Sequence, residues 1–90
     1  MSEIKLSPEQ IEETDTLYER TLILHNDDVN TFDHVIDSLI EVCEHEMEQA
    51  TQCAMITHYN GKCDVKKGSF DYLRPMKQEL TNRNLNVTID

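Results

Sequence analysis

The sequence contains no tryptophan, only two glycines and two prolines, and far fewer basic than acidic residues. Its 8 Lys and Arg residues are outnumbered by 18 Asp and Glu residues, which gives a net charge of -10. Nucleic acid and anionic lipid are both bound through Lys and Arg, so this charge balance disfavours binding to either. It suits partners that carry positive charge, such as amines or basic peptides.

Long apolar segments are also missing. No run approaches the roughly 20 apolar residues that a membrane span needs. The N-terminal MSEIKLSPEQ lacks the apolar region of a secretory signal. With 38% apolar residues in a chain of 90, we expect one small core and no internal ligand cavity. These features predict a cytoplasmic domain that binds neither membrane nor nucleic acid.

The three cysteines, Cys43, Cys53 and Cys63, form no CxxC pair. Each stands where an apolar residue is expected, which favours reduced thiols that pack as small apolar side chains. A disulfide or a zinc site is the alternative reading.

The N-terminal residues differ in composition from the rest. Residues 1–16 are acidic, poor in aromatic residues and contain Pro8, and we expect them to form a flexible arm. Residues 17–90 then make up a single domain.

Within this domain, strand and helix patterns alternate. Strand composition occurs over residues 18–24, 62–67 and 85–90. Helical spacing of apolar residues predicts helices over 32–43, about 46–57, and after residue 69. The order β-α-α-β-α-β predicts an α+β fold, a two-layer sandwich in which three helices cover a small, mostly antiparallel three-stranded sheet.

Details of the helices can also be predicted. Asn30 or Thr31 can cap the first helix. The buried face of the second helix is expected to hold Met47, Ala50, Cys53, Ala54 and Thr57.

The third helix has two candidate starts. Ser69 can cap a helix whose apolar positions, at helical spacing, are Phe70, Leu73, Met76 or Lys77, and Leu80. Because Pro75 lacks an amide donor and suits a first turn, a start near Tyr72 is the alternative.

Catalytic and metal-binding motifs are not found. His45-Glu46 does not extend to HExxH, and no glycine-rich phosphate loop or nucleophile signature occurs. His25 with Asp27, or His34 with Asp37, offers at most a weak chelate. We expect neither an enzyme nor a cofactor or metal.

Polar residues crowd the end of the first strand, where LIL is followed by Asn26, Asp27 and Asp28. One interpretation is an ordinary acidic helix start or an Asx-turn. The other is a receptor for a cation, since amide and carboxylate oxygens accept hydrogen bonds from an ammonium group. His58, at the end of the second helix, is either a further acceptor or a structural residue.

Two blocks of this sequence resemble the ClpS family, the adaptors of the Clp protease. LILHNDDVNTFDHVIDSL is similar to the family's strand followed by N-D-D, and EQATQCAMITHYNGKC is similar to its A-T-x-x-(apolar)-x-x-H-x-x-G-K segment. The blocks also stand at the family's spacing. The resemblance implies the family fold, which is similar to the C-terminal domain of the bacterial ribosomal stalk protein.

The resemblance implies recognition of N-degrons, that is, proteins whose free first residue is Leu, Phe, Tyr or Trp. Family members deliver these substrates to a hexameric AAA+ unfoldase of the ClpA or ClpC type for degradation by ClpP. A monomer suffices for this role. The alternative is a regulatory or structural interaction domain of the same fold that does not bind degrons.

The family's binding residues carry over by position. Asn26 and His58 correspond to the side chains that hold the α-amino group, and Asp27 corresponds to the assisting carboxylate. We expect Asp27 to face solvent in the free protein and Asp28 only to shape the turn. The pocket wall carries over to Asn30, Phe32, Val35, Ala54 and Leu85.

The chain departs from the family pattern in three places. Asn30 and Thr31 replace a usual threonine and proline, and Phe32 and Ala54 occupy positions usually held by methionine. This change predicts an altered preference among the four first residues. After Cys63 the chain is shorter than familiar members, so a shortened variant with a shorter third helix is expected, and its unfoldase partner stays open.

Overall fold

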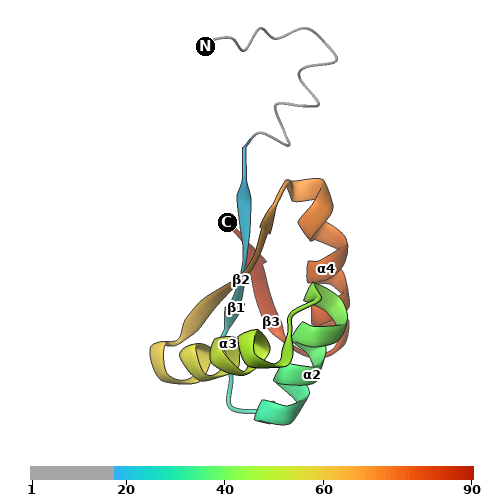
Figure 1. The fold of residues 1–90 in the computed structure, drawn as a ribbon. Coiled ribbons are helices and arrows are strands. Elements are labelled where there is room, and N and C mark those ends of the chain that lie inside the picture. Colours follow the sequence, from blue (N-terminus) through green and yellow to red (C-terminus); the bar gives the residue numbers. More distant parts are fainter. Residues whose placement is uncertain (1–17) are drawn as a thin grey trace, which may run out of the picture.

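The computed structural model describes residues 18–90, and the predicted arm of residues 1–16 lies outside the described residues. The described part contains three strands and three helices in the predicted β-α-α-β-α-β order (Figure 1). The elements are β1 (Arg20–His25), α2 (Phe32–Cys43), α3 (Met47–Asn60), β2 (Lys62–Gly68), α4 (Phe70–Asn82) and β3 (Asn86–Ile89).

The sheet has the strand order β2-β1-β3, and both pairs are antiparallel. At the end of the central strand, His25 pairs with Lys62 on one side and with Asn86 on the other. The segment that leaves β1 therefore starts beside the first residues of both neighbouring strands. This register brings three parts of the sequence to one end of the sheet.

Helices α2 and α4 begin at capping residues that the sequence predicts. The Thr31 side chain accepts a hydrogen bond from the His34 N–H over 3.1 Å, and that of Ser69 accepts one from the Tyr72 N–H over 3.1 Å. Helix α4 thus starts at Phe70, and the later start considered from the sequence is wrong. Pro75 lies inside α4 at an exposed position, where water can satisfy the backbone carbonyl that loses its donor.

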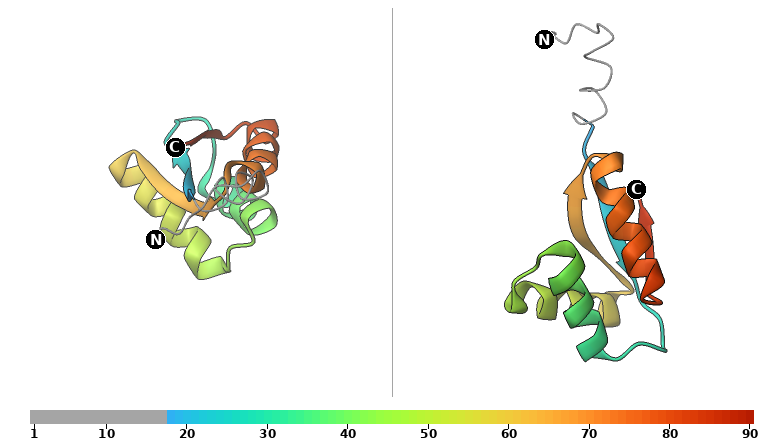
Figure 2. Two further views of the ribbon diagram at one scale, coloured as in Figure 1. Left: turned by 90° about the horizontal axis from the view of Figure 1, so that it is seen from above. Right: turned by 90° about the vertical axis from the view of Figure 1, so that its right-hand side faces the viewer.

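One hydrophobic cluster joins the sheet to all three helices, and Figure 2 shows the arrangement of these elements from two further sides. Its fully buried leucines come from β1, α2 and α4: Leu22, Leu24, Leu39, Leu73 and Leu80. This arrangement confirms the predicted two-layer α+β sandwich. No helix within residues 18–90 has both the length and the apolar character needed to cross a membrane.

Met47 was predicted to be buried, but 63% of its surface is exposed. Like Phe32 and Phe70, which are also exposed, it is the first residue of its helix. Side chains on a helix lean toward its N-terminus, so the side chain of a first residue extends past the core. The other four residues predicted for the buried face of α3 are buried.

The cysteines are free thiols. Cys43 and Cys53 are buried in the core, as the packing interpretation predicted, and Cys63 is half-buried on β2. Burial raises the pKa of the Cys43 thiol to about 11, which keeps it protonated at neutral pH.

Candidate ligand-binding site

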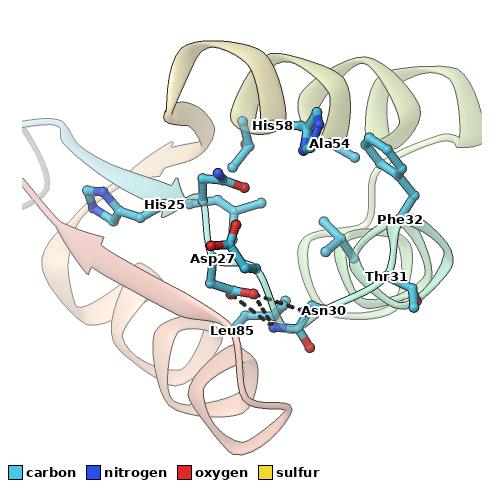
Figure 3. A pocket seen from close by; sticks show the side chains of 13 residues that line it. His25, Asp27, Asn30, Thr31, Phe32, Ala54, His58 and Leu85 are labelled. Atoms are coloured by element: carbon cyan, nitrogen blue, oxygen red, sulfur yellow. Dashed lines mark hydrogen bonds between the residues drawn. The ribbon is translucent and has the colours of Figure 1, made fainter.

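A pocket of about 300 Å³ lies at the end of β1 where the sheet, α2 and α3 meet (Figure 3). All eight residues proposed from the sequence line it: Asn26, Asp27, Asn30, Phe32, Val35, Ala54, His58 and Leu85. The pocket is open to solvent at the protein surface, so it is not an internal cavity of the kind that the composition led us not to expect. In Figure 3, Asp27, Phe32, His58 and Leu85 lie on different sides of this space.

The two polar blocks meet because the backbone joins them. The Asn26 N–H donates to the Gly61 carbonyl over 2.8 Å, and the Gly61 N–H donates to the Thr57 carbonyl over 2.9 Å. Gly61 has a φ of 96°, a left-handed conformation that glycine adopts without steric cost. Asn26 is thereby fixed against the last turn of α3, which carries His58.

The carboxylate of Asp27 organises the segment after β1. It accepts hydrogen bonds from the backbone N–H groups of Val29, at 2.9 Å, and Asn30, at 3.0 Å. The Asn30 side-chain amide adds bonds of 3.2 and 3.0 Å to the two carboxylate oxygens. This is an Asx-turn, one of the two readings considered for the sequence.

One expectation about this turn is therefore wrong. The carboxylate that shapes the turn belongs to Asp27, not Asp28, and Asp27 itself is partly exposed. The reason is geometric, since an Asx-turn uses backbone N–H groups two and three residues after the acidic one. Those two donors at Val29 and Asn30 stand at the right distance from Asp27.

These bonds also affect the charge of Asp27. Partial burial by itself raises the pKa of this carboxyl, but the hydrogen bonds donated by the backbone of Asn30 and Val29 and by the Asn30 side chain outweigh it. The pKa of Asp27 is therefore lowered, and the group is ionised at neutral pH. The Oδ2 atom accepts only one of the four bonds, so it can accept another.

The apolar part of the pocket faces this polar end. Ala54 and Leu85 are almost fully buried, while 44% of the Phe32 surface is exposed. The Phe32 ring lies edge-on to the His58 imidazole, with ring centroids 5.2 Å apart. This contact connects α2 to α3 at the boundary between the apolar and polar parts.

Five lining residues were not identified from the sequence: Leu24, His25, Asp28, Thr31 and Thr57. Thr57 is buried and its hydroxyl donates to the Cys53 carbonyl over 2.8 Å, so it contributes apolar surface to the pocket. Thr57 could have been identified from the sequence, because it directly precedes His58 and lies on the buried face predicted for α3. In residues 18–90, no cluster of three or more His, Cys, Asp or Glu side chains is arranged to hold a metal ion.

The geometry suits a molecule with a cationic head and an apolar body. Acceptor oxygens and an imidazole stand at one end, and aliphatic and aromatic side chains form the wall.

Two comparisons with known proteins bear on the family and the fold of this chain. Residues 14–88 match the family model of the ATP-dependent Clp protease adaptor protein ClpS. The fold is similar to the structure of Agrobacterium tumefaciens ClpS2 bound to L-phenylalaninamide, with a TM-score of 0.77 and 20% sequence identity. That match covers 80% of this chain and 94% of the other.

Proposed function

The chain belongs to the ClpS family of Clp protease adaptors, and we propose that it binds proteins through a free N-terminal residue with a bulky hydrophobic side chain. The observation that carries the proposal is the meeting of Asn26, Asp27 and His58 at one end of an apolar pocket. ClpS2 of Agrobacterium tumefaciens, bound to L-phenylalaninamide, offers a parallel: that ligand has a free amine beside a benzyl group.

The polar end is suited to an α-amino group. Such a group titrates near pH ~7.7–8.0 and is mostly protonated at neutral pH, with three N–H donors. The Asn26 amide oxygen, the free capacity of the Asp27 carboxylate and a neutral His58 imidazole can accept these donors. Acetylating the amine removes its charge and adds bulk, so the acceptors that the bound ligand covers are left unmatched, at a cost of about 1–3 kcal/mol per group.

The apolar end supplies the second requirement. Burying a large apolar side chain against Phe32, Val35, Ala54 and Leu85 contributes roughly 1.5–3 kcal/mol. As the family resemblance implies, the preferred first residues are Leu, Phe, Tyr and Trp. Because neither contribution alone gives tight binding, the pocket selects chain starts that provide both.

Delivery to an unfoldase is the second part of the proposal. Membership in a family of Clp adaptors supports a partner of the ClpA or ClpC type, with the chain acting as a cytoplasmic monomer that performs no chemistry on its substrate. The pocket lies at the end of β1 and is open to solvent, so a bound substrate can extend away from the fold.

One observation favours a different function. The Asp27 carboxylate already serves the Asx-turn, as it also would in an interaction domain of this fold that binds no degrons. Fluorescence anisotropy with a Phe-starting peptide and its N-acetylated twin separates the two functions. The adaptor binds only the free amine, whereas the interaction domain binds neither peptide.

A further inference from the structure

The turn between α4 and β3 carries Leu85 to the pocket, and two side chains outside that turn hold it in place. The His34 Nε2–H donates to the Arg83 carbonyl over 2.8 Å. The Asn30 side-chain amide donates to the next carbonyl along the chain, that of Asn84, over 2.9 Å. The carbonyls of Arg83 and Asn84 follow the end of α4, where helix carbonyls lack partners within the helix. Side chains from α2 and from the segment that caps it supply the missing hydrogen-bond donors.

The turn itself has a specific backbone conformation. Asn84 has a φ of 70°, in the left-handed region that asparagine tolerates better than most residues. The Leu85 N–H returns to the Leu80 carbonyl over 3.0 Å. With these bonds made, the Arg83 and Asn84 carbonyls remain available to His34 and Asn30.

A third contact ties the same turn to α2. The Arg83 guanidinium lies 2.7 Å from a Glu41 carboxylate oxygen and 3.3 Å from one of Glu79. Glu41 and His34 both belong to α2, so this helix holds Arg83 by its side chain and by its backbone. Leu85, two residues further on, is only 4% exposed.

Asn30 connects the two ends of the pocket. Its single amide group donates to the Asp27 carboxylate and to the Asn84 carbonyl. A shift of the α4–β3 turn therefore moves the polar end as well as the wall formed by Leu85. His34 does not line the pocket, and its hydrogen bond to the Arg83 carbonyl connects it to the turn that carries Leu85.

We propose that His34, together with Asn30, is a positioning residue that fixes the depth of Leu85 and so sets the preference among bulky first residues. The proposal rests on the proposed function. Close-packed walls do not adjust freely, so a small displacement of Leu85 changes the fit of a large ring more than that of a leucine side chain.

The test compares variants of the full chain. His34→Leu and His34→Asn both lose the bond to Arg83, the first by removing the donor and the second by shortening its reach. His34→Gln keeps a donor of similar reach. Lys66→Met is the matched control, because the Lys66 ammonium also donates to a carbonyl at a helix end, that of Cys43 over 2.9 Å, but lies outside the pocket.

The main readout is the ratio of affinities for Trp-starting and Leu-starting peptides. We expect His34→Leu and His34→Asn to shift this ratio by about threefold or more, because the free energy of one hydrogen bond corresponds to a change of about this size in an equilibrium constant. His34→Gln and Lys66→Met should keep the wild-type ratio, although Lys66→Met unfolds at a lower temperature. An unchanged ratio in both bond-losing variants, or an equal shift in Lys66→Met, overturns the proposal.

A second readout needs no ligand. Hydrogen exchange at the amides of residues 83–86 should become faster in the two bond-losing variants and not in Lys66→Met. If the wild type binds no peptide, the proposed function fails and the role in preference fails with it. In that case the hydrogen-exchange rates by themselves test whether His34 positions the turn. An unchanged exchange rate at the Leu85 amide in the two bond-losing variants contradicts this role.

Discussion

The backbone N–H of Asn26 donates to the carbonyl oxygen of Gly61 over 2.8 Å, which joins the end of β1 to the end of α3. This one bond places two polar segments from distant parts of the sequence at the same pocket. The bond joins the backbones of the two segments, so the fold itself holds the acceptors on both of them in place. Preorganisation of this kind reduces the entropy that binding must overcome.

Replacing Gly61 tests this junction. No atom lies within 4 Å of a Cβ built on Gly61, so Gly61→Ala meets no clash and its cost comes from the left-handed φ alone. We expect Gly61→Ala to lower the free energy of unfolding by about 1–2 kcal/mol and Gly61→Asn to lower it less. Chemical denaturation measures both. Equal stability of Gly61→Ala and the wild type would contradict the backbone description.

The charge of Asp27 predicts a pH dependence. Because its pKa is lowered from the ordinary value of 3.8 on folding, the ionised group stabilises the native state above pH 3.8. This contribution is lost as the pH falls through the lowered value. Asp27→Asn keeps an acceptor oxygen for the turn but cannot ionise. We expect the wild type to be the more stable of the two at pH 7, with the difference shrinking below pH 4.

The same variant separates the turn from the binding role. Asp27→Asn should weaken binding of a Phe-starting peptide at pH 7 because an amide attracts an ammonium less than a carboxylate does. Thermal denaturation of the unliganded variant checks that the fold is intact. Undiminished peptide affinity would show that the carboxylate serves only the Asx-turn.

His58 is expected to act as an acceptor and not only through packing. His58→Phe keeps an aromatic ring beside Phe32, whose centroid lies 5.2 Å from the imidazole, but removes both nitrogens. We expect about tenfold weaker binding with a small change in stability, as for the loss of one hydrogen bond to a charged group. A variant that binds as the wild type does would assign His58 to packing.

Ala54 is expected to control the size of the pocket. Ala54→Met adds bulk at a wall position that is 3% exposed, so it should reduce affinity for Trp-starting peptides about tenfold more than for Leu-starting ones. Met55→Ala, at an exposed position next to it and outside the pocket, is the control. Parallel losses for both peptides would indicate general destabilisation instead of selection by size.

The elements of the fold could be predicted because their signals are local. Thr31 and Ser69 mark helix starts, and the spacing of apolar residues indicates the faces of the helices. Met47 was misplaced because spacing alone does not show where a helix extends past the core.

Only the site residues that the family resemblance identifies could be predicted from the sequence. The eight residues named from the sequence share one pocket, but the interactions that arrange them depend on tertiary contacts. The bond from Asn26 to Gly61 and the bond from His34 to Arg83 join residues far apart in sequence. No periodicity or local motif encodes such a pair. The sequence also predicted that Asp28 shapes the turn, whereas the carboxylate that does so is that of Asp27.

The central claim is that the pocket recognises a free amine and a bulky side chain on the same first residue. The most direct measurement is the affinity of the full chain for three peptides that differ only at the first residue: Phe with a free amine, Phe with an acetylated amine, and Ala with a free amine. We predict binding of the first and a loss of about tenfold or more for each of the others, because each lacks one contribution. Equal affinity for the acetylated and free Phe peptides, or no binding of any of the three, would contradict the account.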